Sequence, residues 1–94
     1  MSEKYHVKIS PSALRVLSVG PPRGVPLSAA WAIYEFIDGP LSRDPWRVSK
    51  PLHNELEGWR GSRRGEYRVV LRIDETIQTI NVDRVDHRAD IYRT

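Results

Sequence analysis

The stretch that decides the fold runs from Gly58 to Ile73 and reads GWRGSRRGEYRVVLRI. From its tenth residue onward two sets of side chains alternate; the first is Tyr67, Val69, Leu71 and Ile73, and the second is Arg68, Val70 and Arg72. Such alternation predicts a strand whose first set faces a core and whose second set faces the open side of a sheet. Because Arg64-Gly65-Glu66 is typical of a turn, a preceding strand near Leu56 to Arg63 would complete a hairpin.

The chain before this hairpin predicts one strand and two helices. Alternation from Tyr5 to Ile9 indicates a half-buried strand. Ser10 followed by Pro11 is typical of a helix start, since serine caps free backbone N–H groups and proline suits the first helical position. A second helix has apolar residues at three- and four-residue spacing, all expected to face the core: Leu27, Ala30, Trp31, Tyr34, Ile37 and Leu41. Gly39-Pro40 is expected to interrupt this helix, with one further turn to Arg43.

The remaining chain predicts a long loop and a final strand. The loop is expected between Asp44 and Gly58, and the strand between Ile77 and Val85. The order strand, two helices, three strands predicts an α+β domain, with two N-terminal helices packed on a mostly antiparallel four-stranded sheet. A length of 94 residues fits a single domain over residues 1–94.

Composition excludes several classes of protein. No apolar run approaches the roughly 20 residues that cross a bilayer, and the N-terminus lacks the apolar stretch of a signal peptide. The sequence has no cysteine, and His6, His53 and His87 are scattered without metal-ligand spacing. No phosphate-binding glycine loop or nucleophilic serine motif is present. We therefore expect a cytoplasmic protein without membrane contact, metal or cofactor.

Basic charge is concentrated in one stretch. The sequence carries 15 basic and 12 acidic residues, a net charge of +3, whereas residues 60–72 hold five arginines against Glu66 alone. Guanidinium groups suit bidentate contact with phosphate, so an open sheet face that carries them fits an extended polyanion. A merely solvated face is the alternative, with Arg68 paired to Glu66 or Asp83 across strands.

Two motifs resemble a known family. Residues 58–70 resemble the R-x-G-x-Y-R strand pair of RelE/ParE-type bacterial toxins, and residues 85–93 resemble the HRxxxYR ending of that superfamily. Residues 38–41, Pro45 and residues 50–52 are similar to its helix end and loop. Over roughly residues 4–93 the chain is most similar to the RelE branch, that is, to RelE/RelG-like toxins.

The resemblance implies a toxin of a type II toxin–antitoxin system, which enters the ribosomal A site and cuts the mRNA there. The implied chemistry needs no metal, because the ribose 2′-hydroxyl attacks the adjacent phosphate and leaves a 2′,3′-cyclic phosphate and a 5′-hydroxyl. The catalytic residues implied by the family's motifs are Arg63, Arg68, Arg88 and Tyr92, and His87 is a further candidate because it lies next to the matching ending. Implied supporting RNA contacts are Lys50, Arg60, Arg64 and Arg72.

The resemblance implies a role for each of these residues. Arg68 and Arg88 stabilise charge on the phosphate, and Arg63 assists proton transfer and charge balance, with Arg64 as its substitute if the spacing differs. Tyr92 stacks on or orients the mRNA base. His87 is an acid or base, because its ordinary pKa near 6.5 suits proton transfer.

The resemblance leaves two other functions open. A ParE-like toxin would inhibit gyrase without nuclease chemistry, although such relatives usually lack the clustered basic and tyrosine ending. A catalytically inactive relative would only bind its antitoxin. The implied partner in every case is a small antitoxin, RelB-like or other, that masks the arginine-rich face and forms a hetero-oligomer. The ribosome and mRNA are partners of the nuclease alone.

Overall fold

A computed structural model describes residues 4–88 and shows an α+β architecture. The elements are β1 (His6–Ile9), α1 (Pro11–Ser18), α2 (Leu27–Phe36), η1 (Ile37–Leu41), β2 (Lys50–Pro51), η2 (Asn54–Leu56), β3 (Arg60–Arg64), β4 (Tyr67–Asp74) and β5 (Thr79–His87). The strands form one sheet in the order β1-β5-β4-β3-β2. Only β1 and β5 pair in parallel; the other neighbouring strands are antiparallel.

The fold class is confirmed, whereas the predicted strand count of four is wrong. The additional strand is β2, which pairs with Arg60 and Gly61 at the sheet edge. Its two residues lie in the stretch expected to be a loop, because proline in that stretch argues against a central strand but is tolerated at an edge. Two boundaries also differ: β3 begins at Arg60 after the short helix η2, and β5 runs over Thr79–His87.

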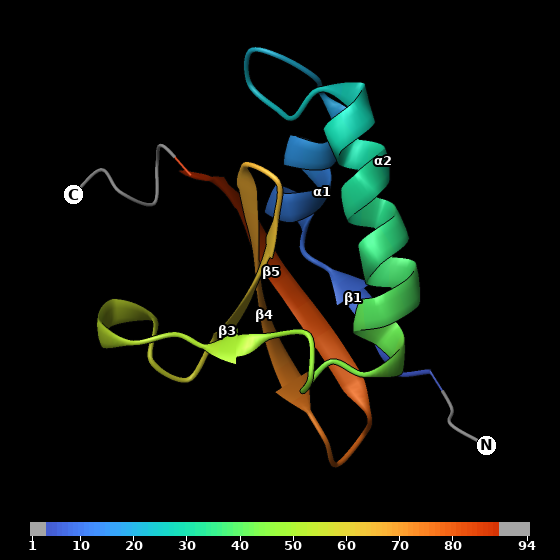
Figure 1. Cartoon of the computed structure of the whole chain (residues 1–94), viewed down its shortest axis with the longest axis vertical. Helices are drawn as coiled ribbons and strands as arrows, with labels where there is room; N and C mark the ends of the chain where they lie inside the picture. The colour runs from blue at the N-terminus through green and yellow to red at the C-terminus, as the bar shows by residue number, and fades with distance from the viewer. Residues whose placement is uncertain (1–3, 89–94) are drawn as a thin grey trace.

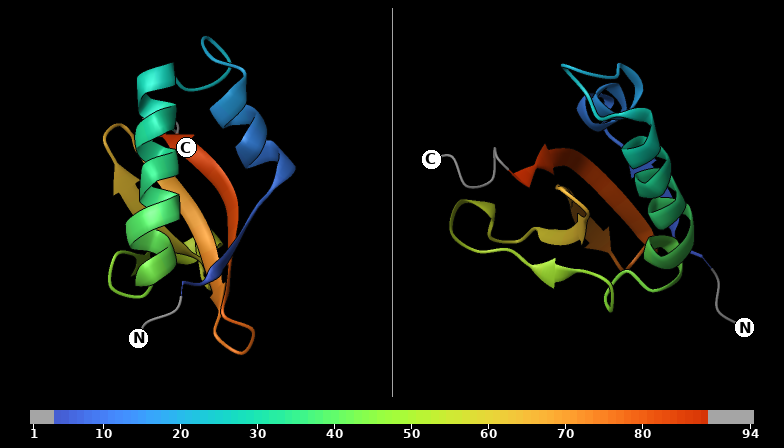
Figure 2. Two further views of the ribbon diagram at one scale, coloured as in Figure 1. Left: turned by 90° about the vertical axis from the view of Figure 1, so that its right-hand side faces the viewer. Right: turned by 45° about the horizontal axis from the view of Figure 1, so that its top comes forward.

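Both helices cover one face of the sheet and leave the other face without a helix among the described residues (Figures 1 and 2). The core lies between these two layers. Its buried side chains come from both helices, from η1, from β4 and β5 and from the loop before α2: Ala13, Leu17, Val25, Ala30, Ile33, Phe36, Ile37, Leu41, Val69, Leu71, Ile80, Val82 and Val85. The alternation predicted for β4 is confirmed for Val69 and Leu71, which belong to this core, and for Arg68 and Arg72, which do not. Val70, expected on the open side, is instead fully buried.

The second helix departs from the prediction in two ways. Trp31 and Leu27 were expected in the core, but they are 62% and 73% exposed. The helix instead buries Ala30, Ile33 and Phe36, so its core-facing stripe is rotated away from the expected one. Gly39-Pro40 does not end the helical path either, because η1 continues it as a π-helical segment with Pro40 inside. The wider π turn tolerates a proline that would clash in an α-helix.

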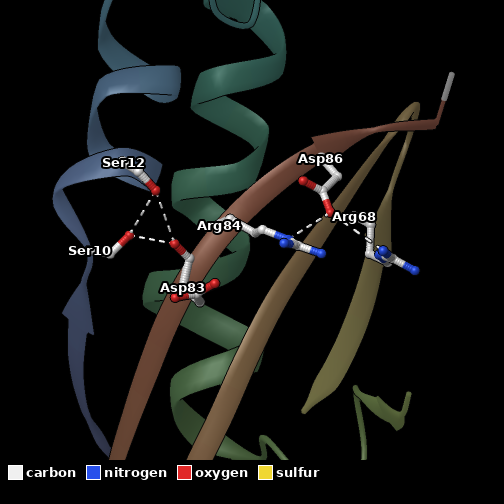
Figure 3. Close-up of polar contacts among 6 residues, drawn as sticks. All are labelled: Ser10, Ser12, Arg68, Asp83, Arg84 and Asp86. Carbon is white, nitrogen blue, oxygen red and sulfur yellow. Dashed lines mark hydrogen bonds and ion pairs between the residues drawn. The ribbon is translucent and has the colours of Figure 1, made fainter. Parts of the chain in front are cut away.

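A β-bulge in β5 sets which side chains face away from the helices. The pairing of β4 with β5 joins Leu71 to Val82 and Val70 to Arg84, so Asp83 is skipped. The Asp83 backbone carbonyl instead accepts hydrogen bonds from the Ser10 and Ser12 hydroxyls at the start of α1 (Figure 3). Ser10 also accepts from the Ala13 N–H at 3.1 Å, which confirms the predicted helix cap. Sequence patterns did not predict the bulge.

The bulge shifts the alternation of β5 by one residue. Val82 and Val85 both belong to the core although they lie three positions apart. Their neighbours Arg84 and Asp86 therefore project to the opposite face, where Arg68 lies. Without the extra residue, Arg84 and Asp86 would point toward the helices.

Candidate functional site

A groove of about 490 Å³ lies on the sheet face away from the helices. Its walls come from the end of the loop after η1, from β2, from β3 and from β4: Val48, Lys50, Pro51, Leu52, Gly61, Ser62, Arg63 and Arg68. Arg63 and Arg68 are direct cross-strand partners in the hairpin that the sequence predicted. The groove therefore brings together three of the predicted site residues: Lys50, Arg63 and Arg68.

Two glycines make this hairpin and its groove possible. Gly65 lies in the two-residue turn with φ near 60°, a left-handed conformation that side chains disfavour. At Gly61 a Cβ atom would lie 3.0 Å from Leu52 Cδ2 and 3.3 Å from Arg68 Cδ. Glycine at this position thus leaves room for the Arg68 stem to cross the neighbouring strand.

Arg68 is held by an acid that the sequence did not single out. Its Nη2 lies 3.4 Å from Asp86 Oδ2, and Arg84 Nε lies 3.1 Å from the same oxygen (Figure 3). The alternative pairing of Arg68 with Glu66 or Asp83 is wrong: Glu66 pairs with Arg88, and Asp83 offers its backbone carbonyl to α1. Two guanidinium groups share one carboxylate, so this part of the groove wall keeps a net positive charge.

Arg88 lies beside the hairpin turn rather than in the groove lining. Its Nη1 is 3.3 Å from Glu66 Oε1, and its backbone N–H donates to the Glu66 carbonyl at 2.7 Å. Both side chains are about 60% exposed, so the ion pair is weak and open to exchange with another anion. Because Arg63 and Arg68 form the second residue pair from this turn, Arg88 lies near their end of the hairpin.

Two predicted site residues lie on the opposite face of the sheet. The His87 ring packs edge-on against Tyr67, with centroids 5.1 Å apart, and both line a pocket of about 310 Å³ with Arg23 and Val25. The Arg64 guanidinium lies 3.6 Å over the Phe36 ring of α2. His87 and Arg64 therefore lie on the helix side of the sheet and do not line the groove with Arg63 and Arg68. Tyr92 lies outside the described residues.

The other two predicted RNA contacts stack on tryptophans. Arg60 lies 4.8 Å over Trp46 and donates to the Ser49 hydroxyl at 2.7 Å and the Ser49 carbonyl at 2.8 Å. Arg60 thus anchors the loop that leads directly into Lys50, and it does not line the groove. Arg72 lies 4.1 Å over Trp59, in a separate pocket of about 210 Å³ farther along β4.

A third contact fixes the same loop to the far end of the sheet. Glu75 Oε1 accepts from the Tyr5 hydroxyl at 2.6 Å and from Trp46 Nε1 at 2.7 Å. These two hydrogen bonds lower the pKa of the Glu75 carboxyl, and the bond from Tyr5 has the larger effect. The bond to Glu75 correspondingly raises the pKa of the Tyr5 hydroxyl.

We expect the contribution of Glu75 to stability to disappear in acid. Because the pKa of this carboxyl is lower in the folded chain, the stabilisation is present above the ordinary value of 4.5 and is lost as pH falls through the folded-state pKa. Thermal unfolding from pH 7 to pH 3 tests this by comparing the chain with Glu75→Gln. The difference in Tm should shrink toward acid, and a difference that stays constant would contradict the expectation.

Within residues 4–88 no group of three histidine or acidic side chains is arranged to hold a metal ion. No helix in the same range has the length and apolar character needed to cross a membrane.

Comparisons with known proteins identify the class of toxin to which this architecture belongs. No family model matches the sequence. Toxin RelG from Mycobacterium tuberculosis is 48% identical over 89 residues, which cover 95% of this chain and 97% of that protein. Toxin RelE from the same organism is 40% identical over 89 residues, covering 95% and 87%. The toxin–antitoxin complex RelBE2 from M. tuberculosis contains a chain that superposes with a TM-score of 0.80 and 42% identity, covering 92% of this chain and 100% of that one.

The fold is therefore that of a small α+β toxin. The chain belongs to the RelE family and is a toxin of a type II toxin–antitoxin system, as its motifs indicated.

Proposed function

We propose that this toxin is a ribosome-dependent endoribonuclease that cuts mRNA in the ribosomal A site and so stops translation in the cytoplasm. The observation that carries the proposal is the groove in which Lys50, Arg63 and Arg68 converge from three adjacent strands. A groove with three cations along one wall suits the phosphate backbone of a single RNA strand. RelE-family membership supports the same activity.

The proposed reaction is attack of a ribose 2′-hydroxyl on the adjacent phosphate. The O2′–P bond forms and the P–O5′ bond breaks, while the 2′-hydroxyl loses a proton and the leaving 5′-oxygen gains one. The products are a 2′,3′-cyclic phosphate and a 5′-hydroxyl. Such a reaction needs positive groups that stabilise charge on the phosphorane, and it needs no metal ion.

We assign these tasks to residues of the groove and to two residues of the family's C-terminal motif. Arg68 stabilises the phosphorane, because it is anchored on a central strand and its partner Asp86 is shared with Arg84. Arg63 and Lys50 balance charge and assist proton transfer from the neighbouring strands β3 and β2. Arg88 can exchange its exposed partner Glu66 for an RNA phosphate. Tyr92 is proposed to stack on the mRNA base, as the family motif implies.

A translation extract tests this function. Added to the extract, the chain should cut a reporter mRNA inside ribosome-bound codons, and the new 3′ ends should carry a 2′,3′-cyclic phosphate. The same mRNA without ribosomes should remain intact. Arrest of growth with DNA breaks and uncut mRNA would instead identify a gyrase-inhibiting toxin, and would overturn the proposal.

We also propose that the partner is a RelB-like antitoxin that lies over the helices. Among the described residues, large apolar side chains stand exposed around a groove of about 280 Å³ between α1 and α2, which Leu17, Leu27, Trp31 and Tyr34 help to line. Exposed apolar surface of this kind marks a protein-binding site. An amphipathic segment of the antitoxin fits it, and the related RelBE2 structure is itself a toxin–antitoxin complex.

A further inference from the structure

Arg68, which lines the groove, belongs to an ionic cluster with Arg84 and Asp86, two residues that have no role in the reaction above. Asp86 Oδ2 lies 3.4 Å from Arg68 Nη2 and 3.1 Å from Arg84 Nε (Figure 3). Arg68 and Asp86 are direct cross-strand partners on β4 and β5. Arg84 reaches them only because the bulge at Asp83 turns it to this face. Two cations therefore compete for one carboxylate beside the groove.

The distances show which cation is held more weakly. Charge-assisted N–H···O bonds are typically about 2.7–2.9 Å long, so the contact of Arg68 at 3.4 Å is loose. In addition, Arg68 Nε is buried and has no hydrogen-bond partner. A buried donor without an acceptor is unfavourable, so this guanidinium gains by binding an anion. Arg84, whose side chain is 42% exposed, makes the shorter contact with Asp86.

We propose that Arg84 is a positioning residue that neutralises Asp86 and thereby leaves Arg68 available to the scissile phosphate. This inference rests on the proposed nuclease function. If Arg84 were absent, Asp86 would pair with Arg68 alone, and its charge would also repel an approaching phosphate. With Arg84 in place, Arg68 can exchange Asp86 for the phosphate while the carboxylate keeps a counter-ion.

The proposal makes a prediction with a definite sign. Arg84→Ala should slow ribosome-dependent cleavage by about five- to tenfold, the size expected for a partly exposed charge pair at a binding site. Adding Asp86→Asn to Arg84→Ala should restore the rate to within about twofold of the unmodified chain, because the competing charge is gone. Arg84→Lys keeps the positive charge and should also stay within about twofold.

A merely structural role predicts the opposite of this rescue, since removing both partners would add to the damage. The matched control is Arg47, whose Nε lies 2.9 Å from Asp44 Oδ2 in an exposed pair outside the groove. Arg47→Ala, alone or with Asp44→Asn, should leave cleavage unchanged. If Arg84→Ala cuts as fast as the unmodified chain, or if Asp86→Asn fails to rescue it, the proposal is wrong.

A second measurement separates this proposal from the function on which it rests. The side-chain Nε–Hε signal of Arg68, followed by nitrogen-15 NMR in the isolated chain, should shift in Arg84→Ala and return in Arg84→Lys. The shift is expected because Asp86 tightens on Arg68 once Arg84 is gone. An unmoved Arg68 signal would overturn the positioning role even in a chain that cleaves mRNA. Absence of cleavage by the unmodified chain would instead refute the nuclease function.

Discussion

Arg68→Ala is expected to reduce mRNA cleavage by about 10²- to 10³-fold, the loss typical when one preorganised donor to a developing oxyanion is removed. Arg68 lines the groove from a central strand: it is the cross-strand partner of Arg63, and its strand β4 lies between β3 and β5. Alanine at this position removes the charge while the strand remains. The rate of cutting in a translation extract, and relief of growth arrest on induction in cells, measure the effect.

The fold should survive this change. The pair of Arg68 with Asp86 is long and partly exposed, and Arg68 Nε has no partner to lose, so unfolding should become easier by only about 1 kcal/mol or less. Arg15→Ala is the matched control, because it removes the same charge from the exposed surface of α1. Arg15→Ala should cut mRNA at the normal rate. Persistent cleavage and arrest in a folded Arg68→Ala chain would exclude Arg68 from the chemistry.

The sequence predicted those parts of the fold in which local pattern and tertiary environment agree. Alternation from residue 67 to residue 73 identified β4 and its core face, and the turn at Gly65 identified the hairpin in which Arg63 and Arg68 pair. The helix cap at Ser10 was likewise predicted from the local sequence. The edge strand β2 was missed, because its two residues include a proline and carry no alternation.

The candidate site was harder to predict, because strand register decides which face a side chain takes. The pairing of Tyr67 with His87 puts both on the helix side, so His87 lies away from the groove. The skipped Asp83 reverses the alternation and brings Arg84 and Asp86 to Arg68. The spacing of Val82 and Val85, three rather than two, was the available signal for that bulge.

Trp31 is a further case, because its apolar character and its spacing both suggested burial, whereas the structure exposes it. The buried residues of α2 are Ala30, Ile33 and Phe36. Trp31 follows Ala30 directly, so its side chain lies about 100° away from that of Ala30 around the helix. When apolar residues are this frequent, three- and four-residue spacing is met on more than one face of the helix, so the spacing does not identify the buried face. The exposed tryptophan is consequently informative about a partner rather than about the core.

Trp31→Asp is expected to weaken antitoxin binding by about 30- to 100-fold, the loss typical of removing an aromatic hot spot from the centre of an interface. Trp31 is 62% exposed and lines the apolar groove between α1 and α2 together with Leu17 and Tyr34. A buried aspartate at this position would lack a partner in the complex, which adds to the lost apolar contact. Because Trp31 does not pack in the core of the chain alone, stability should change little.

The measurement is calorimetric titration of the proposed RelB-like antitoxin into the chain, with the Arg68→Ala background keeping the host cells alive. The matched control is Ala32→Asp, which adds the same charge at an exposed neighbouring position of α2 outside that groove. Ala32→Asp should bind within about threefold of the unmodified chain, as expected for a peripheral contact. Equal affinities for Trp31→Asp and Ala32→Asp would show that the antitoxin does not use the groove between the helices. A selective loss in Trp31→Asp would place an apolar antitoxin segment on the helix layer, on the side of the sheet opposite the arginine groove, so that the antitoxin could hold the toxin without filling its catalytic face.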